Sequence, residues 1–146
     1  MDHATNTSPL SVTQAVSLEL IDANGEATPI DAELHYDPTD PYAVTAMFLT
    51  GHAAVQWTFG RELLSAGLDE PSGDGDVHVW PCLDSDGHAV VIVELHSPDG
   101  EALVQARTGD LRRFVEKTCR VVPPGTESGR IDVDSAISAI LAAEAA

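Results

Sequence analysis

Apolar and polar residues alternate over much of the first half of the chain, which is typical of strands in a sheet with one buried face. The alternation starts near Val12, stops at Asn24-Gly25, a strong signal for a tight turn, and resumes over residues 30–36. Residues 42–50 are apolar on both sides, which indicates a central strand, and the next strand ends at Phe59. We therefore predict four antiparallel strands, of which the first two form a hairpin.

A short helix is expected after these strands, over residues 61–68. Gly60 can serve as its N-cap, and Gly67 is expected to take the left-handed conformation just past its last turn. The leucines of this helix form one apolar ridge, which we expect in the core: Leu63, Leu64 and Leu68. The acidic, glycine-rich residues 69–76 have little to bury, and we expect them to form an exposed loop.

Strand patterns return after this loop. Val77 and Val79 resume the alternation until Pro81, which cannot donate to a central ladder of hydrogen bonds. Two more strands are expected over residues 88–96 and 101–107, preceded by turns at residues 84–87 and 97–100, and the first of these is a hairpin turn and not a calcium loop. This brings the expected total to seven or eight strands, arranged as two antiparallel groups of about four with the short helix between them.

Two helices are expected in the last third of the chain. The first is capped by Thr108 and ends at Pro123-Pro124-Gly125, and apolar or small residues recur along it at helical spacing: Leu111, Phe114, Val115 and Thr118. The second begins at Asp132 and carries one apolar stripe: Val133, Ile137, Ile140 and Leu141. The predicted fold class is therefore α+β: two antiparallel sheets of about four strands, with a helix between them and two C-terminal helices. We expect a flexible lead over residues 1–11 and a single domain over residues 12–146.

Charge is the outlying property of this 146-residue chain. Twenty-four Asp and Glu stand against seven Lys and Arg, which gives a formal net charge of −17. Such a surface repels phosphate backbones and anionic lipids, so nucleic acid and membrane insertion are not expected. The first basic residue is Arg61, which leaves no basic region for a secretory signal, and the two cysteines fit a reducing compartment. We expect a cytoplasmic protein.

The few basic residues are gathered in one place. Five of the seven lie on or beside the helix after Thr108: Arg107, Arg112, Arg113, Lys117 and Arg120. Arg112, Arg113, Lys117 and Arg120 are candidate partner-binding residues, because such a stripe can receive an acidic partner or nucleic acid. The alternative, favoured here, is that the stripe pairs with the chain's own surplus carboxylates.

Candidate chemistry is sparse. Asp37 and Asp40 lie close together, but each precedes a proline and is explained as a turn residue. His78 and Cys82 share one side of a strand, yet four residues of strand separate them by roughly 13 Å, which is too far to share a metal ion. The sequence contains no Walker loop, GxSxG elbow or HExxH motif. We therefore predict no catalytic, metal or cofactor site and no enzyme activity.

Several longer stretches resemble the SsgA-like proteins, which are sporulation and cell-division regulators of filamentous actinomycetes. They are YDPTDPYAV from Tyr36, WTFGRELL and PSGDGDVHVWP between Trp57 and Pro81, SPDGEAL from Ser97, VPPGTE from Val122 and DVDSAISAIL near the C-terminus. The resemblance covers about residues 16–141. The polar N-terminal lead is longer than the family pattern, and Gly60 stands where the family favours alanine, which leaves the paralogue open.

The resemblance implies a non-enzymatic adaptor of sporulation-specific septum formation. It implies a fold similar to that of the whirly single-stranded nucleic-acid-binding proteins and subunits that intertwine through helices as a homotrimer. The expected partners are other SsgA-like proteins and FtsZ, the tubulin-like division protein, or septum-associated proteins, which places the chain at the septum. The alternative function is a single-stranded nucleic-acid-binding module, although likeness of fold does not carry function with it.

Overall fold

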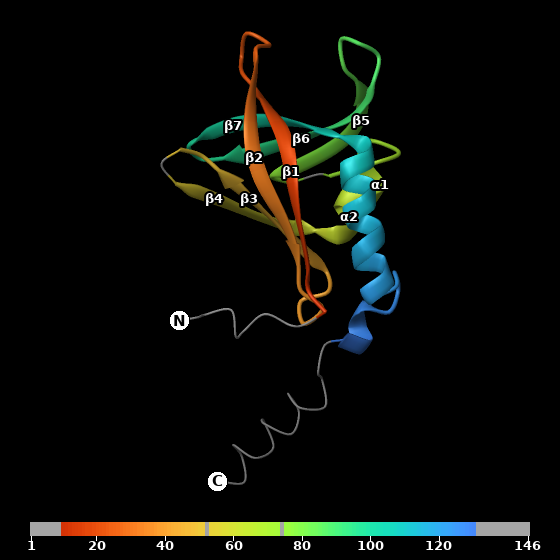
Figure 1. Ribbon diagram of the computed structural model, residues 1–146. Coiled ribbons are helices and arrows are strands. Elements are labelled where there is room, and N and C mark those ends of the chain that lie inside the picture. Colours follow the sequence, from red (N-terminus) through yellow and green to blue (C-terminus); the bar gives the residue numbers. More distant parts are fainter. Residues whose placement is uncertain (1–9, 52, 74, 131–146) are drawn as a thin grey trace.

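The computed structural model describes residues 10–51, 53–73 and 75–130 (Figure 1). Its elements follow one another along the chain as β1 (Val12–Ile21), β2 (Ala27–Tyr36), β3 (Ala43–Leu49), β4 (Ala54–Gly60), α1 (Arg61–Gly67), β5 (Val77–Leu83), β6 (Ala89–Ser97), β7 (Gly100–Arg107), α2 (Thr108–Val121) and the short 3-10 helix η2 (Glu127–Arg130). The helix predicted from Asp132 onward lies outside the described residues, as do residues 1–9 of the predicted lead.

The described strands form one curled antiparallel sheet, not the two separate sheets that the sequence suggested. Its order is β4-β3-β2-β1-β7-β6-β5, so the strands before and after α1 do form two groups, of four and of three. The groups are joined only where Glu19, Leu20 and Ile21 of β1 pair with residues 103–105 of β7. Local alternation predicts each hairpin but not a pairing between strands more than 80 residues apart in sequence.

Both helices lie on the concave side of the curled sheet (Figure 1). The helical spacing in α2 predicted its buried face correctly, since Leu111, Phe114, Val115 and Thr118 are all buried. Leu111, Phe114 and Val115 join strand residues of both groups in one hydrophobic core. The core is therefore shared by the two strand groups, and α2 bridges them.

Helix α1 packs directly on β5, and Gly67 makes this possible. Gly67 is the last residue of α1 and is not in the left-handed conformation, so the prediction of a left-handed cap there is wrong. A Cβ atom at this position would overlap the buried side chain of Val79. Glycine is thus required for close approach of helix and strand, not for its backbone freedom. Of the predicted ridge, Leu64 and Leu68 are buried and Leu63 is half-buried.

Candidate functional site

The most distinctive side chain of the interior is Arg61, the first residue of α1, which is only 3% exposed. Its guanidinium donates hydrogen bonds to the carbonyl oxygens of Val122 at 2.7 Å and Thr118 at 3.2 Å. A third hydrogen bond joins its Nη2 to Oε2 of Glu127 at 2.8 Å, which forms an ion pair. Arg61 therefore binds the carbonyl-rich end of α2 and the segment that follows it.

The other side of Arg61 is covered by the turn between β2 and β3. Its Cζ atom lies 5.0 Å from the centre of the Tyr36 ring, a cation–π distance. The Tyr36 hydroxyl donates to the Pro41 carbonyl at 2.9 Å, and the Arg61 backbone N–H donates to the Tyr42 carbonyl at 2.8 Å. Three stretches that are distant in sequence thus meet at one guanidinium. We call Arg61, Tyr36, Val122 and Glu127 the arginine anchor.

The charges of the arginine anchor balance each other, since the Arg61 guanidinium pairs with the Glu127 carboxylate. The hydrogen bond from Arg61 holds the pKa of the Glu127 carboxyl below its usual value, with help from backbone N–H groups that include that of Gly125. The guanidinium is in turn directed at carbonyl oxygens and a carboxylate of its own chain. No member of the anchor is a nucleophile placed beside a general base, so this arrangement fits a structural role.

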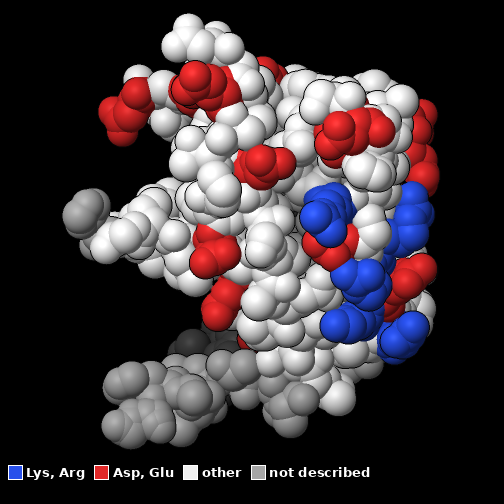
Figure 2. All heavy atoms as spheres, turned by 45° about the horizontal axis from the view of Figure 1, so that its top comes forward, with Lys and Arg blue, Asp and Glu red and all other residues white. Residues whose placement is uncertain are grey.

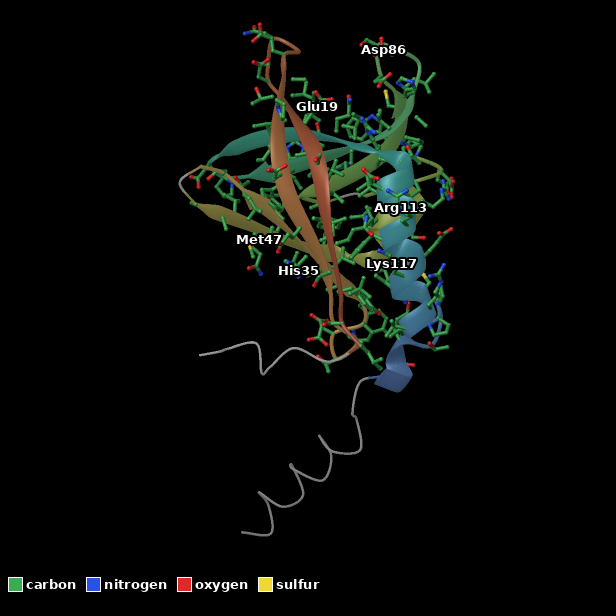
Figure 3. The ribbon with its side chains drawn as sticks, viewed as in Figure 1. Glu19, His35, Met47, Asp86, Arg113 and Lys117 are labelled. Atoms are coloured by element: carbon green, nitrogen blue, oxygen red, sulfur yellow. The ribbon has the colours of Figure 1, made fainter. Side chains whose placement is uncertain are left out.

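The predicted basic stripe lies on the exposed surface of α2 (Figures 2 and 3). Lys and Arg side chains gather there in one band, with some Asp and Glu among them, whereas the rest of the same view shows Asp and Glu alone. We call its four candidate residues the cationic surface of α2: Arg112, Arg113, Lys117 and Arg120. Unlike Arg61, these side chains lie on the solvent side of the helix.

Two of these four cations pair with carboxylates of the chain itself. Arg112 contacts Asp69 at 3.3 Å, and Arg113 pairs with Asp110 one turn earlier in α2. The other two differ: Lys117 donates to the side-chain oxygen of Gln14 at 3.2 Å, and Arg120 has no ion pair with any residue the structure describes. Internal pairing, favoured from the sequence, therefore holds for half of the surface, and Lys117 and Arg120 form no ion pair within the part of the chain that the structure describes.

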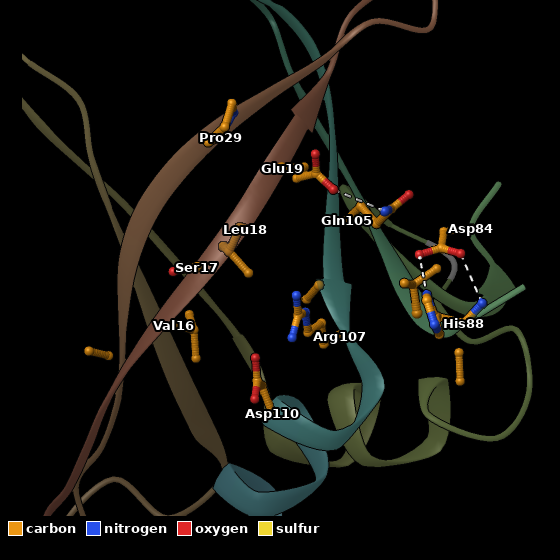
Figure 4. A pocket seen from close by; sticks show the side chains of 14 residues that line it. Val16, Ser17, Leu18, Glu19, Pro29, Asp84, His88, Gln105, Arg107 and Asp110 are labelled. Atoms are coloured by element: carbon orange, nitrogen blue, oxygen red, sulfur yellow. Dashed lines mark hydrogen bonds and ion pairs between the residues drawn. The ribbon is translucent and has the colours of Figure 1, made fainter. Parts of the chain in front are cut away.

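An open cleft of about 830 Å³ lies where β1 and β7 diverge (Figure 4). Arg107 projects into it between Glu19 and Asp110. Its polar side chains are mostly engaged: Glu19 accepts a long contact from Gln105 at 3.4 Å, and Asp84 pairs with His88 at 3.5 Å.

One group of side chains is spaced like metal ligands, Asp84, Asp86 and His88 at the β5–β6 turn. The Asp84 carboxylate accepts the backbone N–H groups of Asp86 and His88 at 2.9 and 2.8 Å, and these hydrogen bonds, that of His88 first, hold its pKa below the usual value. This is turn chemistry, as predicted for residues 84–87. Asp37 behaves likewise, since its carboxylate accepts the N–H and hydroxyl of Thr39.

Comparison with known proteins identifies the family. The model of the Streptomyces sporulation and cell division protein SsgA matches residues 30–127, which include every member of the arginine anchor. The chain belongs to the SsgA family. Relatives within it include the sporulation-specific cell division protein SsgB of Streptomyces coelicolor, 45% identical over 90% of this chain and 96% of that protein. SsgB of Kineococcus radiotolerans is also 45% identical, over 86% of this chain and 77% of its own length.

Solved structures in the SsgA family share the fold. The SsgA-like sporulation-specific cell division protein of Thermobifida fusca superposes with a TM-score of 0.79 at 40% identity, over 88% of this chain and 93% of that one. A structure reported with mutations in SsgB that correlate to longitudinal cell division during sporulation of Streptomyces coelicolor gives 0.78 at 43% identity, over 83% and 95%. The curled seven-stranded sheet with its two helices is thus the SsgA-family fold.

Sequence reasoning missed Arg61 and Glu127. Both lie in stretches that carried the family resemblance, WTFGRELL and VPPGTE, and Tyr36 begins a third. From the sequence alone, an arginine beside a glycine at a helix start is expected at the surface, because the partners that bury it are 57 to 66 residues away.

Among the helices that the structure describes, none has the length and apolar character needed to cross a bilayer.

Proposed function

We propose that this chain is a regulator of sporulation-specific cell division that acts by binding other proteins and not by catalysis. The observation that carries the proposal is membership of the SsgA family, with relatives named as sporulation-specific cell division proteins matching over most of both chains. The site geometry supports it, since the buried charges of the anchor serve the chain's own packing. An adaptor needs such a rigid body with a recognisable surface.

The cationic surface of α2 is our proposed contact surface. In a chain of net charge −17, Lys117 and Arg120, which form no ion pair among the described residues, are where an acidic partner meets attraction instead of repulsion. The proposed partners are FtsZ or septum-associated proteins and other SsgA-family members, which would bring this chain to the septum. The N-terminal half of α2 contributes Arg112 and Arg113, whose exposed ion pairs can exchange for a partner's carboxylates at little cost.

Self-association as a homotrimer is part of the proposal. It is implied by the resemblance of the sequence to this family and supported by the apolar stripe predicted after Asp132, at Val133, Ile137, Ile140 and Leu141. Such a stripe needs an apolar partner, either the chain's own sheet or another subunit. Light scattering at high protein concentration tests this point, and a monomer would contradict it.

Co-purification with division proteins tests the contact surface. The double charge reversal Lys117→Glu with Arg120→Glu should lower recovery of FtsZ about tenfold or more, because two attractions become repulsions. Arg107→Glu is the matched control, since it reverses an exposed arginine in the cleft, away from this surface. If neither the wild type nor the variants recover FtsZ or a family member, the adaptor function loses its main support.

A second candidate function is binding of single-stranded nucleic acid, favoured only by the band of cations on α2. Phosphate contacts release counterions, so binding of single-stranded DNA should weaken steeply as salt rises. The large acidic excess of the chain opposes this function. Absence of binding at low salt would remove it.

A further inference from the structure

The cleft where β1 and β7 diverge is bounded by two projecting hairpins. The β1–β2 and β5–β6 hairpins extend to the same side of the sheet, with Glu19 on the first and Asp86 at the tip of the second (Figures 1 and 3). The start of α2 closes the cleft from below, where Asp110 lines it. At about 830 Å³ the cleft is far larger than a single ion needs, and it has room for a stretch of polypeptide.

Within the described residues, one wall of this cleft is a strand edge that no other strand pairs. The pairing of β1 with β7 ends at Glu19, and α2 holds β1 again only at Gln14, whose side chain donates to the Asp110 carbonyl at 2.8 Å. Residues 15–18 lie between these two points, and β2 pairs with them on their other side. Every second residue of an antiparallel strand directs its N–H and C=O away from its paired neighbour, so this stretch offers main-chain groups to the cleft.

The side chains along this edge define what a neighbouring strand would have to present. Val16 and Leu18 are buried on the core face of β1, whereas Ala15 and Ser17 are small and exposed on the opposite face, which also carries Glu19. A strand laid beside β1 would therefore meet apolar groups on one face, and polar groups with a carboxylate on the other. This stretch before Glu19 contains no charged residue and no proline, the residues with which proteins usually guard an exposed edge.

The charges around the cleft favour a basic occupant. Residues 19–29 of one hairpin and 84–89 of the other contain five Asp and Glu and no Lys or Arg. Arg107 is the only Lys or Arg among the described residues that line the cleft, and it lies between Glu19 and Asp110 (Figure 4). Phosphates, an acidic peptide and a second copy of this chain, with its net charge of −17, all meet repulsion here. A segment rich in lysine or arginine meets attraction.

We propose that the cleft binds an extended segment of a partner protein, in which lysine or arginine alternates with aliphatic residues, as a strand added to residues 15–18 of β1. Main-chain hydrogen bonds to β1 hold this segment, its aliphatic side chains continue the face of Val16 and Leu18, and its cations lie on the side of Glu19. This second surface, opposite in charge to the cationic surface of α2, extends the adaptor function proposed above and rests on it only in that the occupant is a protein.

Fluorescence anisotropy with synthetic peptides tests this binding on the full chain at physiological salt. The probe is a short peptide of alternating lysine and valine, which should bind, whereas its glutamate–valine counterpart should not. Two further probes carry N-methyl groups, one on its lysine amides and the other on its valine amides. One of these two should bind about tenfold more weakly or worse, because the N–H groups that face β1 all belong to the same alternate set.

Variants of the chain locate the binding. Glu19→Lys with Asp86→Lys should weaken binding of the lysine–valine peptide about tenfold or more, because each hairpin loses a carboxylate and gains a cation. Glu70→Lys with Asp99→Lys is the matched control: it makes the same charge change at exposed residues that do not line the cleft, and it should keep the wild-type affinity. Arg107→Glu should instead tighten binding about threefold or more, a gain that a folding defect cannot produce.

Hydrogen exchange shows where the peptide lies, since the amides of residues 15–18 should exchange more slowly when the lysine–valine peptide is bound. If both N-methylated peptides bind like the unmodified one, or if β1 gains no protection, the added strand is wrong. If the lysine–valine peptide does not bind, the cleft is not a site for a basic segment. Lys117→Glu with Arg120→Glu should leave peptide binding unchanged, so a failure of the cleft and a failure of the α2 contact surface are distinguishable.

Discussion

Helix α2 contacts a buried cation from α1 and carries exposed cations of its own, and the contrast between them separates a structural role from the proposed binding role. At its C-terminal end the buried Arg61 is surrounded by carbonyls, a carboxylate and an aromatic ring. Along the outer side of α2 the cationic surface is exposed. Even its ion pair with a residue distant in sequence, Arg112 with Asp69, is open to solvent, since the two side chains are 46% and 73% exposed. A desolvated charge must keep its partners, whereas an exposed charge can exchange them for those of another molecule.

The anchor also accounts for three of the stretches that carry the sequence resemblance. The anchor joins the β2–β3 turn, the start of α1 and the segment after α2, and each of these stretches is a recognisable family motif in the sequence. Such motifs therefore report on the construction of the fold. On the proposed contact surface, in contrast, substitutions should cost little stability.

The largest effect is expected from removing the buried cation. Arg61→Met should lower the free energy of unfolding by about 3–5 kcal/mol, because Glu127 and two carbonyl groups lose their partner in a mostly buried place. Thermal and urea unfolding measure the loss. Arg61→Lys keeps the charge without the guanidinium fork and should lose less. If Arg61→Met lowers the free energy of unfolding no more than a substitution of a surface arginine does, the buried and the exposed cations do not differ in their contribution to stability.

A smaller effect is expected where α1 seats on β5. Gly67→Ala places a methyl group against the fully buried Val79, and relief of this overlap should cost about 1–3 kcal/mol. Because α1 carries Arg61, its displacement should also loosen the anchor, which amide hydrogen exchange in the last turn of α2 can detect. Gly60→Ala is the control: its added carbon would meet neighbours only at 3.8 Å and beyond, in ordinary contact. Equal losses in both variants would contradict the close approach.

Local pattern was enough to predict the hairpins, the short helix and the buried face of α2. These features depend only on residues close together in sequence: the alternation from Val12 to Leu20, the turn at Asn24-Gly25 and the apolar positions of α2. The join of β1 to β7 could not be predicted in this way, since it rests on only three residue pairs between distant strands. The single sheet therefore appeared in the sequence as two.

The anchor was hidden for the same reason, and Gly67 for a different one. Nothing beside Arg61 in sequence explains its burial, because the groups that compensate its charge come from α2 and η2. The sequence indicates that Gly67 has a structural role, but a glycine can serve either a left-handed backbone or a close approach, and the sequence does not distinguish the two. Only the position of Val79 decides between them.

The pH dependence of stability sharpens the comparison further. Folding lowers the pKa of Glu127 below its ordinary value of 4.5, so the folded state favours the carboxylate. The stabilisation is present above about pH 4.5 and is lost as pH falls through the lower folded pKa, since the unfolded chain takes up the proton first. Glu127→Gln should therefore be less stable than the wild type at neutral pH and lose this deficit in acid. A constant difference between the two across that range would contradict the charge-assisted bond.

The smallest effect on stability is expected at the exposed cations, and this prediction completes the comparison. Arg112→Ala or Lys117→Ala should change the free energy of unfolding by less than about 0.5 kcal/mol, because both side chains are solvated and their contacts are at 3.2–3.3 Å. Binding should respond in the opposite order: these variants should weaken partner recovery while thermal unfolding stays near that of the wild type. If instead Lys117→Ala destabilises the chain strongly, its contact with Gln14 is a second anchor of α2 on β1, and the cationic surface belongs to the architecture after all.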